Sequence, residues 1–141
     1  MRLVVLDTNV IVSARVSPRS TPAKLLVDWI LAGEVQTVTS PAIILEYREG
    51  TTRRKFARYG FPPPWLEFLI AESLQLPDES AWPRRLPDPD DLPFIALAHR
   101  AGAWLVTGNL KHYPVAARSD VTVVSPSDYL AHLTSSRSPQ R

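Results

Sequence analysis

A short apolar run near the amino terminus constrains the fold more than any other feature of the chain. Residues 3–6 read Leu-Val-Val-Leu, and the run ends at once in Asp7. Four consecutive apolar residues suit a strand that is buried on both faces of a parallel sheet, because neither face is left for polar side chains. The run therefore predicts an α/β fold, and it places Asp7 at the carboxyl end of a buried strand.

Strand and helix patterns alternate along the rest of the chain. Further strands are predicted over residues 35–39, 103–107 and 121–124, with a brief one near 74–76. Helices are predicted over residues 21–32, 40–56, 63–74 and 90–101, and from Pro126 to Leu133. Such alternation favours a central parallel sheet covered by helices on both faces, which is a three-layer α/β/α sandwich.

The helix starts carry typical signals, and the chain has the size of a single domain. Thr21 and Ser40 each precede a proline, so each supplies an N-cap residue before a proline at the first helical position. A length of 141 residues argues for one domain. We expect this domain to span residues 1–133, and we expect residues 134–141 to form a disordered polar tail.

Composition excludes several classes of protein. The chain has no cysteine, which excludes a disulfide scaffold, a thiol nucleophile and a cysteine zinc site. Its five glycines form no phosphate-binding loop, which disfavours a nucleotide-dependent kinase or a dinucleotide enzyme. No apolar run reaches the roughly 18 residues of a membrane helix, so we expect a cytoplasmic protein without membrane contact. The net charge of +2 is too small to indicate nucleic acid by itself.

Acidic and amide side chains gather where the predicted strands end. Ligand sites of open parallel sheets lie at the carboxyl ends of the strands. Asp7 follows the first strand, Asn109 follows the strand 103–107, and Glu46 lies in the helix after the second strand. A run of aspartates starts the helix that leads into the strand 103–107, and it consists of Asp88, Asp90 and Asp91. We therefore expect these side chains to share one edge of the sheet.

Several carboxylates at one edge repel one another unless a cation lies between them. Oxygen ligands suit hard divalent cations such as Mg²⁺ and Mn²⁺, and the three histidines show no paired ligand spacing. Structural alternatives stay open for each acid. Asp7 also suits a helix cap, Glu46 an ion pair with Arg48 or Arg53, and one of the three aspartates an N-cap.

Three segments of the chain together resemble a known family. They are MRLVVLDTNVIVSA at residues 1–14, SPAIILEYREGTTRRKF at residues 40–56 and DPDDLPFIALAHRAGAWLVTGN at residues 88–109. In this order they resemble PIN-domain proteins, and they are most similar to the VapC-like ribonuclease toxins of type II toxin–antitoxin pairs. The resemblance runs from Met1 to about Leu133. It implies a PIN-like sandwich and a Mg²⁺- or Mn²⁺-dependent nuclease that cuts phosphodiester bonds, usually in RNA.

The resemblance also implies roles for individual residues. The catalytic and metal-binding acids of the family correspond to Asp7, Glu46 and Asp91, and Asp88, one turn earlier, shares the metal-binding role. Asn109 takes a fourth catalytic position, where an aspartate is commoner. An asparagine still offers a neutral oxygen, but the site loses one negative charge. A second cation should therefore bind more weakly.

Other residues near this cluster are candidates for substrate contact. The candidates for positioning water or a phosphate beside Asp7 are Thr8, Asn9, Ser13 and Thr107. The densest basic run holds Arg53, Arg54 and Lys55, which are the candidates for contacts with RNA phosphates. Two alternatives stay open for this run, namely a solvated surface and a docking face for an acidic antitoxin segment.

We therefore expect a metal-dependent endoribonuclease with Mg²⁺ or Mn²⁺ as its cofactor, acting as the toxin of a toxin–antitoxin pair. The resemblance implies an RNA substrate, a cognate antitoxin protein and a homodimer. The alternative is a PIN-fold module that binds RNA or protein with weak or no catalysis, in which Asn109 marks a decayed site. A nuclease of the same fold that acts on DNA also stays open.

Overall fold

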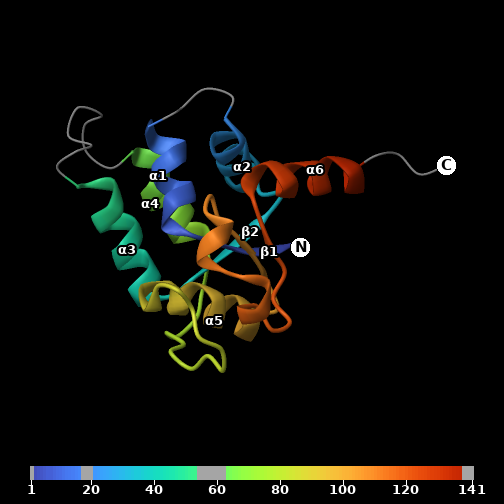
Figure 1. Cartoon of the computed structure of the whole chain (residues 1–141). Helices are drawn as coiled ribbons and strands as arrows, with labels where there is room; N and C mark the ends of the chain where they lie inside the picture. Colours follow the sequence, from blue (N-terminus) through green and yellow to red (C-terminus); the bar gives the residue numbers. More distant parts are fainter. Residues whose placement is uncertain (1, 17–20, 54–62, 138–141) are drawn as a thin grey trace.

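The computed structural model describes residues 2–16, 21–53 and 63–137 and has a central sheet of five strands (Figure 1). The strands are β1 (Leu3–Leu6), β2 (Gln36–Thr39), β3 (Leu74–Gln75), β4 (Trp104–Val106) and β5 (Val123–Val124). They lie in the order β3-β2-β1-β4-β5, and every neighbouring pair is parallel. The predicted parallel sheet is confirmed, and β1 occupies its centre.

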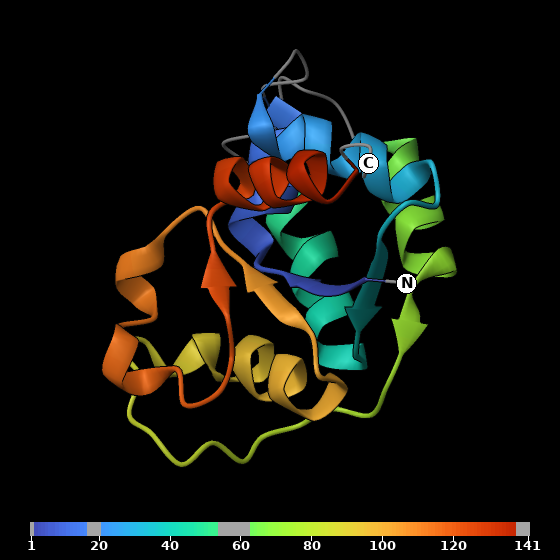
Figure 2. The same cartoon turned by 90° about the vertical axis from the view of Figure 1, so that its right-hand side faces the viewer.

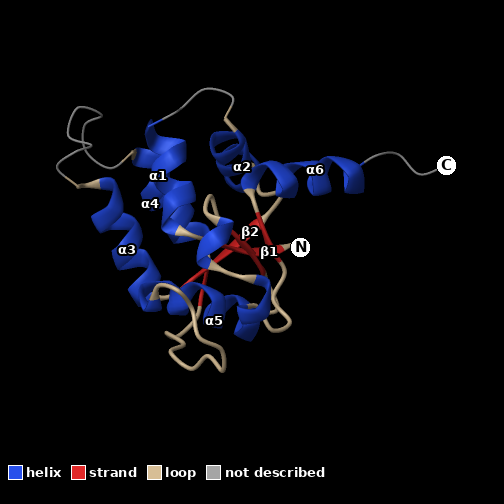
Figure 3. Cartoon of the chain, in the orientation of Figure 1, coloured by secondary structure: helices blue, strands red, loops and turns tan. Residues whose placement is uncertain are grey.

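Helices cover both faces of this sheet. The described residues form α1 (Thr8–Val16), α2 (Pro22–Leu31), α3 (Pro41–Thr51), α4 (Pro64–Glu72), α5 (Leu92–Ala101) and α6 (Pro126–Arg137). They also form the short 3-10 helices η2 (Pro89–Asp91), η3 (Leu110–His112) and η4 (Val115–Ala117). Figure 2 shows α5 on one side of the sheet and α1, α2 and α6 on the other, and Figure 3 shows the strands between these helices. The three-layer α/β/α sandwich is confirmed.

None of the helices within the described ranges is long and apolar enough to cross a bilayer.

The core lies on both faces of the sheet because the central strand is apolar on both sides. Val4, Val5 and Leu6 of β1 are each 0% exposed. Helix α5 packs against β1 and β4 from one side, and its Phe94 is buried there. The apolar run is thus covered from both faces, as its composition predicts, and Asp7 stands where this core meets the carboxyl edge of the sheet.

Helix α1 has no counterpart among the predicted elements. Its three consecutive β-branched residues, Val10, Ile11 and Val12, have low intrinsic helix propensity. Tertiary packing outweighs this preference, because Val10, Ile11 and Ala14 are buried in the core. The helix begins directly after Asp7, so this aspartate lies at the positive end of the helix dipole.

Helix α3 is shorter than predicted. It ends at Thr51, whereas the sequence predicts helix as far as residue 56, and residues 54–56 lie outside the described part of the chain. The hydroxyl of Thr52 donates to the carbonyl oxygen of Arg48 at 2.9 Å. This side-chain bond satisfies one of the last carbonyl groups and competes with continuation of the helix.

Helix α6 is longer than predicted. It continues to Arg137, beyond the predicted end at Leu133, so the predicted polar tail begins in a helix. Residues 134–137 contain neither proline nor glycine, and Pro139 is the first residue that cannot extend a helix. Residues 138–141 lie outside the described part. Every other predicted helix or strand bound agrees with the structure within two residues.

Candidate functional site

A cavity of about 350 Å³ opens at the carboxyl edge of the sheet. It is lined by Asp7, Thr8, Asn9, Val12, Glu46, Arg53, Asp88, Asp90, Asp91, Phe94 and His112. They come from the end of β1, α1, α3 and the residues just after it, η2 with its N-cap, α5 and η3. The structure therefore brings the four acids predicted to bind metal into one cavity.

Asp7 is the most buried acid of this cavity. It is 5% exposed, and its Oδ2 accepts hydrogen bonds from the hydroxyls of Thr107 and Tyr113, each at 3.0 Å. Burial raises the pKa of Asp7, and the two hydroxyl donors oppose this rise. Both donors lie about a hundred residues away in the sequence. Asp7 therefore makes long-range contacts as well as preceding α1, which a helix cap alone would not require.

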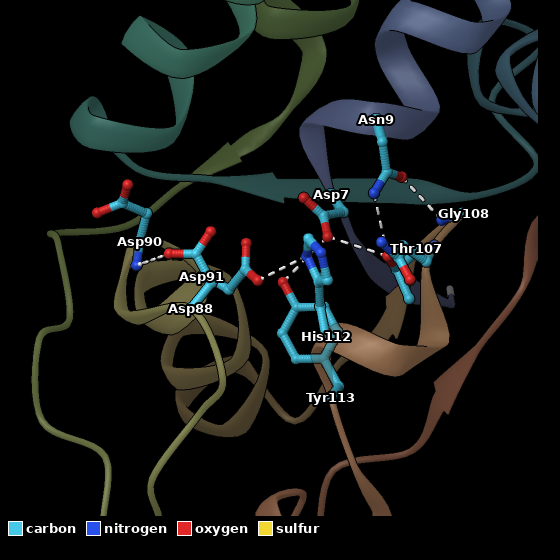
Figure 4. A network of polar contacts seen from close by, with 10 residues as sticks. Asp7, Asn9, Asp88, Asp90, Asp91, Thr107, Gly108, His112 and Tyr113 are labelled. Atoms are coloured by element: carbon cyan, nitrogen blue, oxygen red, sulfur yellow. Dashed lines mark hydrogen bonds and ion pairs between the residues drawn. The ribbon is translucent and has the colours of Figure 1, made fainter.

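Thr107 is the centre of the hydrogen bonds around Asp7 (Figure 4). Its hydroxyl donates to Asp7 and accepts from the side-chain amide of Asn9 at 3.3 Å and from the backbone N–H of Asn109 at 3.1 Å. The side-chain oxygen of Asn9 in turn accepts from the backbone N–H of Gly108 at 2.7 Å. Thr107 is 0% exposed. We therefore assign it to positioning Asp7 and not to the predicted substrate contact.

Asp91 lies at the junction of η2 and α5 and is 8% exposed. Burial and the charge of Asp7 raise the pKa of Asp91 to about 6. His112 Nδ1 lies 2.9 Å from Asp91 Oδ2, a contact without the alignment of a hydrogen bond. The third predicted acid is thus buried beside a charge of its own sign, with one nearby imidazole.

The two aspartates next to Asp91 also line the cavity, and Asp88 has a structural role as well. Its carboxylate accepts the backbone N–H of Asp90 at 2.9 Å, which caps η2. The predicted N-cap role for one of the three aspartates therefore belongs to Asp88. This bond does not remove Asp88 from the cavity, since one oxygen is used and the other remains.

Glu46 extends from α3 into the same cavity and is half-buried. Burial raises the pKa of Glu46, the charge of Arg53 lowers it, and the charge of Asp7 raises it further. Arg48 is not its partner, because Arg48 makes two hydrogen bonds to Glu67 of α4, at 2.7 and 2.9 Å. Of the two arginines predicted as ion-pair partners of Glu46, Arg53 is therefore the one whose charge acts on this carboxylate.

Some predicted site residues are not brought to the cavity. Asn109 and Ser13 are half-buried and do not line it, and Asn109 contributes only its backbone N–H to the network around Asp7. Arg54 and Lys55 lie outside the described residues. The assignment of a catalytic role to the Asn109 side chain therefore stays a prediction.

Tyr113 is a neighbour of Asp7 that the sequence patterns do not reveal. It is 0% exposed, and burial together with the charge of Asp7 raises its pKa, which keeps the hydroxyl protonated and able to donate. Tyr113 belongs to no predicted helix or strand, so no periodicity marks it as buried. Its position directly after His112, close behind the strand that ends at the cavity, is the one available signal.

The residues of the cavity match a hard divalent cation in donor type. Most of their possible ligand atoms are carboxylate oxygens, and one buried hydroxyl oxygen in this region, Thr8 Oγ1, lacks a hydrogen-bond partner. Within the described ranges, however, no three acidic or histidine side chains stand close enough together to hold a metal ion. The side chains thus fit the ion in donor type, but in this arrangement they are not gathered around a single point.

Comparison with known proteins gives a family and several structural relatives. Residues 3–111 match the family model described as PIN domain. An uncharacterized protein of Methanocaldococcus jannaschii is 33% identical over 111 residues, which cover 75% of this chain and 70% of that protein. The structure of VapBC2 from Rickettsia felis bound to a promoter DNA fragment has a TM-score of 0.59 at 15% identity. That match covers 87% of this chain and 98% of the other.

A second solved structure, FitAcB from Neisseria gonorrhoeae, has a TM-score of 0.56 at 19% identity and covers 88% of this chain and 98% of the other. At such identities the two structures establish a shared fold. The family match is broader evidence, because it spans more than half of the chain and includes Asp7, Glu46 and Asp91. The chain therefore belongs to the PIN domain family.

Proposed function

We propose that the protein is a metal-dependent endoribonuclease that hydrolyses phosphodiester bonds in RNA. The observation that carries this proposal is the single cavity at the sheet edge, in which Asp7, Glu46, Asp88 and Asp91 meet. Carboxylates that share one cavity, with the pKa of three of them raised, are costly unless the site serves a cation. The resemblance to VapC-like toxins supports the choice of RNA as substrate.

The residues proposed to hold Mg²⁺ or Mn²⁺ are Asp7, Glu46 and Asp91, with Asp88 beside them. A bound ion supplies Lewis-acid chemistry for phosphodiester hydrolysis. The chain itself contributes orientation, because Thr107 and Tyr113 hold one oxygen of Asp7 in place. We assign the Asn109 amide to the fourth position, with one negative charge fewer than an aspartate.

Substrate binding is proposed for the cationic side of the cavity. Arg53 lines the cavity and is exposed, so its guanidinium can pair with a phosphate next to the carboxylates. Thr8 and Asn9 line the same space, and Arg54 and Lys55 continue the basic run in sequence. Binding that depends on these contacts should weaken as salt is raised.

The proposed partners are a cognate antitoxin and a second copy of the chain. The resemblance to toxin components supports both, and the fold shared with VapBC2 and FitAcB is consistent with a toxin–antitoxin pair. A cytoplasmic location is proposed on the same grounds, and a chain without cysteine is compatible with it.

A cleavage assay tests the proposed function. The purified protein is incubated with a panel of RNAs and single-stranded DNAs in Mn²⁺, in Mg²⁺ and in EDTA. We expect metal-dependent cutting of RNA, and we expect Asp7→Asn to slow it roughly 100-fold or more, because a contribution of several kcal/mol from the cation is lost. Asp128→Asn, at an exposed acid of α6, is the matched control and should cut like the wild type. Equal cutting by Asp7→Asn would reveal a contaminating nuclease or a different site.

A non-catalytic binding module is the second candidate function. One observation favours it, namely that the described residues contain no group of three acids or histidines close enough to hold a metal. This candidate predicts a folded protein that binds RNA or a protein partner, cuts neither nucleic acid and gains no stability from Mn²⁺. Cutting of DNA without cutting of RNA would instead identify a DNA nuclease of the same fold.

A further inference from the structure

Two consecutive residues after β4 contact two different carboxylates of the cavity. His112 ends η3 and reaches Asp91, and Tyr113, the next residue, reaches Asp7. Asp7 and Asp91 lie far apart in the sequence, and this short segment contacts both of them. Figure 4 shows the histidine next to Asp91 and the tyrosine ring below the histidine in this view.

Tyr113 occupies one particular oxygen of Asp7. Its hydroxyl and that of Thr107 both donate to Asp7 Oδ2, each at 3.0 Å. The other oxygen of Asp7 takes part in neither bond and points toward the space between Asp7 and Asp91 (Figure 4). A carboxylate with one oxygen held by two donors cannot rotate freely, so the remaining oxygen keeps a defined direction.

His112 contacts one oxygen of Asp91, although without the aligned hydrogen bond that Tyr113 donates to Asp7. Its Nδ1 lies 2.9 Å from Asp91 Oδ2, and the other oxygen of Asp91 is directed away from the imidazole (Figure 4). The Asp91 side chain is 11% exposed and the His112 side chain 38%. The imidazole therefore stands on the solvent side of a buried carboxylate and lines the cavity.

The segment that carries both contacts is itself anchored by hydrogen bonds. The backbone N–H of Tyr113 donates to the carbonyl oxygen of Leu110 at 3.0 Å, and that of His112 donates to Asn109 at 3.1 Å. The Nε of Arg118 donates to the carbonyl oxygen of Tyr113 at 2.7 Å. Side chains on a segment held in this way can impose a fixed geometry on the groups that they contact.

We propose that His112 and Tyr113 form a carboxylate clamp that holds one oxygen each of Asp91 and Asp7 and so presents the other two oxygens to a divalent cation. Both are positioning residues in this proposal, acting on the cation through the two acids. The clamp rests on the proposed function, because it presupposes that the cavity binds a metal. The proposal gives the segment after β4 a role of its own, which is to orient the two acids.

The need for such a clamp follows from the charges. Asp7 and Asp91 repel each other, and without external contacts each carboxylate can rotate away from the other. A cation then has to reorganise both groups before it gains their full attraction. Groups that fix the orientation of metal ligands commonly change metal affinity by roughly 10- to 100-fold when they are removed.

The test is the Mn²⁺ concentration that gives half-maximal thermal stabilisation, measured without substrate for the full chain. The variants are Tyr113→Phe, which removes only the hydroxyl, and His112→Phe, which keeps a ring but removes both nitrogens. We expect each to need roughly tenfold more Mn²⁺ than the wild type. His112→Gln retains an N–H donor and should restore most of the affinity. Melting in EDTA verifies that every variant is folded.

Matched controls come from the opposite part of the molecule. Tyr129 and His132 of α6 pack against Trp104 and lie outside the acidic cavity. Tyr129→Phe and His132→Phe therefore repeat the same chemical changes away from the acids, and both should keep the wild-type Mn²⁺ dependence.

The titration tests both the clamp and the proposed metal-dependent function. Weaker Mn²⁺ binding in both cavity variants, with recovery in His112→Gln, supports the clamp. An unchanged Mn²⁺ dependence in Tyr113→Phe and His112→Phe, with a normal response of the wild type, overturns the clamp alone. Tighter binding by His112→Phe also overturns it, because the histidine is then a competitor of the cation. A wild type that shows no response to Mn²⁺ overturns the proposed function and the clamp together.

Discussion

At the scale of single residues, the raised pKa of Asp91 makes the stability of the folded protein depend on pH, and this dependence can be measured. The pKa of Asp91 is the ordinary 3.8 of an aspartate in the unfolded chain, and burial and the charge of Asp7 raise this pKa to about 6 in the folded protein. Below the lower value both states are protonated, and Asp91 carries no cost. Above the higher value the folded state holds an unfavourable charge, which lowers stability by on the order of 2 kcal/mol.

Asp91→Asn should therefore stabilise the metal-free protein at neutral pH. We expect its melting temperature in EDTA to exceed that of the wild type by roughly 5 °C near pH 7.5. The difference should shrink as pH falls through 6 and vanish near pH 4. Asp128→Asn at an exposed position is the control for the substitution itself. A variant less stable than the wild type at neutral pH would show that the charged form of Asp91 does not destabilise the folded protein.

The sequence predicts the acids of the site but not the groups that hold them. Asp7, Glu46 and Asp91 are marked by their places after a strand, inside an apolar helix stretch and before a helix. These are local features. Tyr113 reaches Asp7 across 106 residues, and no local pattern signals such a contact. For the same reason the burial of Thr107 and the absence of Asn109 from the cavity lining emerge only from the folded chain.

At the scale of elements, the close approach of α1 and α3 depends on Gly50. A Cβ at this position would lie 2.8 Å from Thr8 Cγ2, which is closer than carbon atoms pack. Thr8 also lines the cavity, so the spacing of these two helices sets one wall of the site. Replacing the glycine by alanine gains up to about 1 kcal/mol of helix propensity but overpacks the contact at a cost of roughly 1–3 kcal/mol.

We expect Gly50→Ala to destabilise the metal-free protein by about 1 kcal/mol, since the overpacking exceeds the propensity gain. The same change in a Thr8→Ser background should be stabilising, because serine lacks the methyl group and keeps the hydroxyl. Urea unfolding of the four proteins in EDTA measures both effects. Equal effects of the alanine in the two backgrounds would show that the contact does not limit the helix spacing.

Element prediction succeeded where patterns are strong and failed where packing overrides them. Residues 4–6 of the apolar run are fully buried, as an entirely apolar strand should be. The sequence does not predict helix α1, because its β-branched residues lower helix propensity. Packing against α2 and α3 stabilises the helix. The end of α3 at Thr51 depends on side-chain bonds to backbone carbonyls, which composition does not specify.

At the scale of the whole molecule, the order of the strands explains where the cavity lies. The chain builds β2 and β3 on one side of β1 and then places β4 and β5 on the other. The connections after β1 and β4 therefore diverge, and a crevice forms between them at the carboxyl edge. Asp7 follows β1 and His112 follows β4, so both stand at this crevice. The sequence predicts the edge, whereas the strand order comes from the structure.

Long-range connections deliver the remaining acids to the same place. Helix α3 brings Glu46 from the β2 side. The segment between β3 and η2 runs past α5 (Figure 2), and in it Trp82 Nε1 donates to the carbonyl oxygen of Ala117 at 2.9 Å. It leads to Asp88, the N-cap of η2, and to Asp91 at the end of η2. The site thus depends on the complete fold, and it should be lost as a unit when the protein unfolds.

Calorimetric titration of Mn²⁺ into the metal-free wild type and into Asp7→Asn tests the central claim most directly, which is that the acidic cavity binds a divalent cation. The wild type should show a saturable heat of binding with a defined stoichiometry. Asp7→Asn should remain folded and show little or none, because one buried ligand loses its charge. Absence of binding heat in the wild type, or equal heats in both proteins, would contradict the assignment of the cavity.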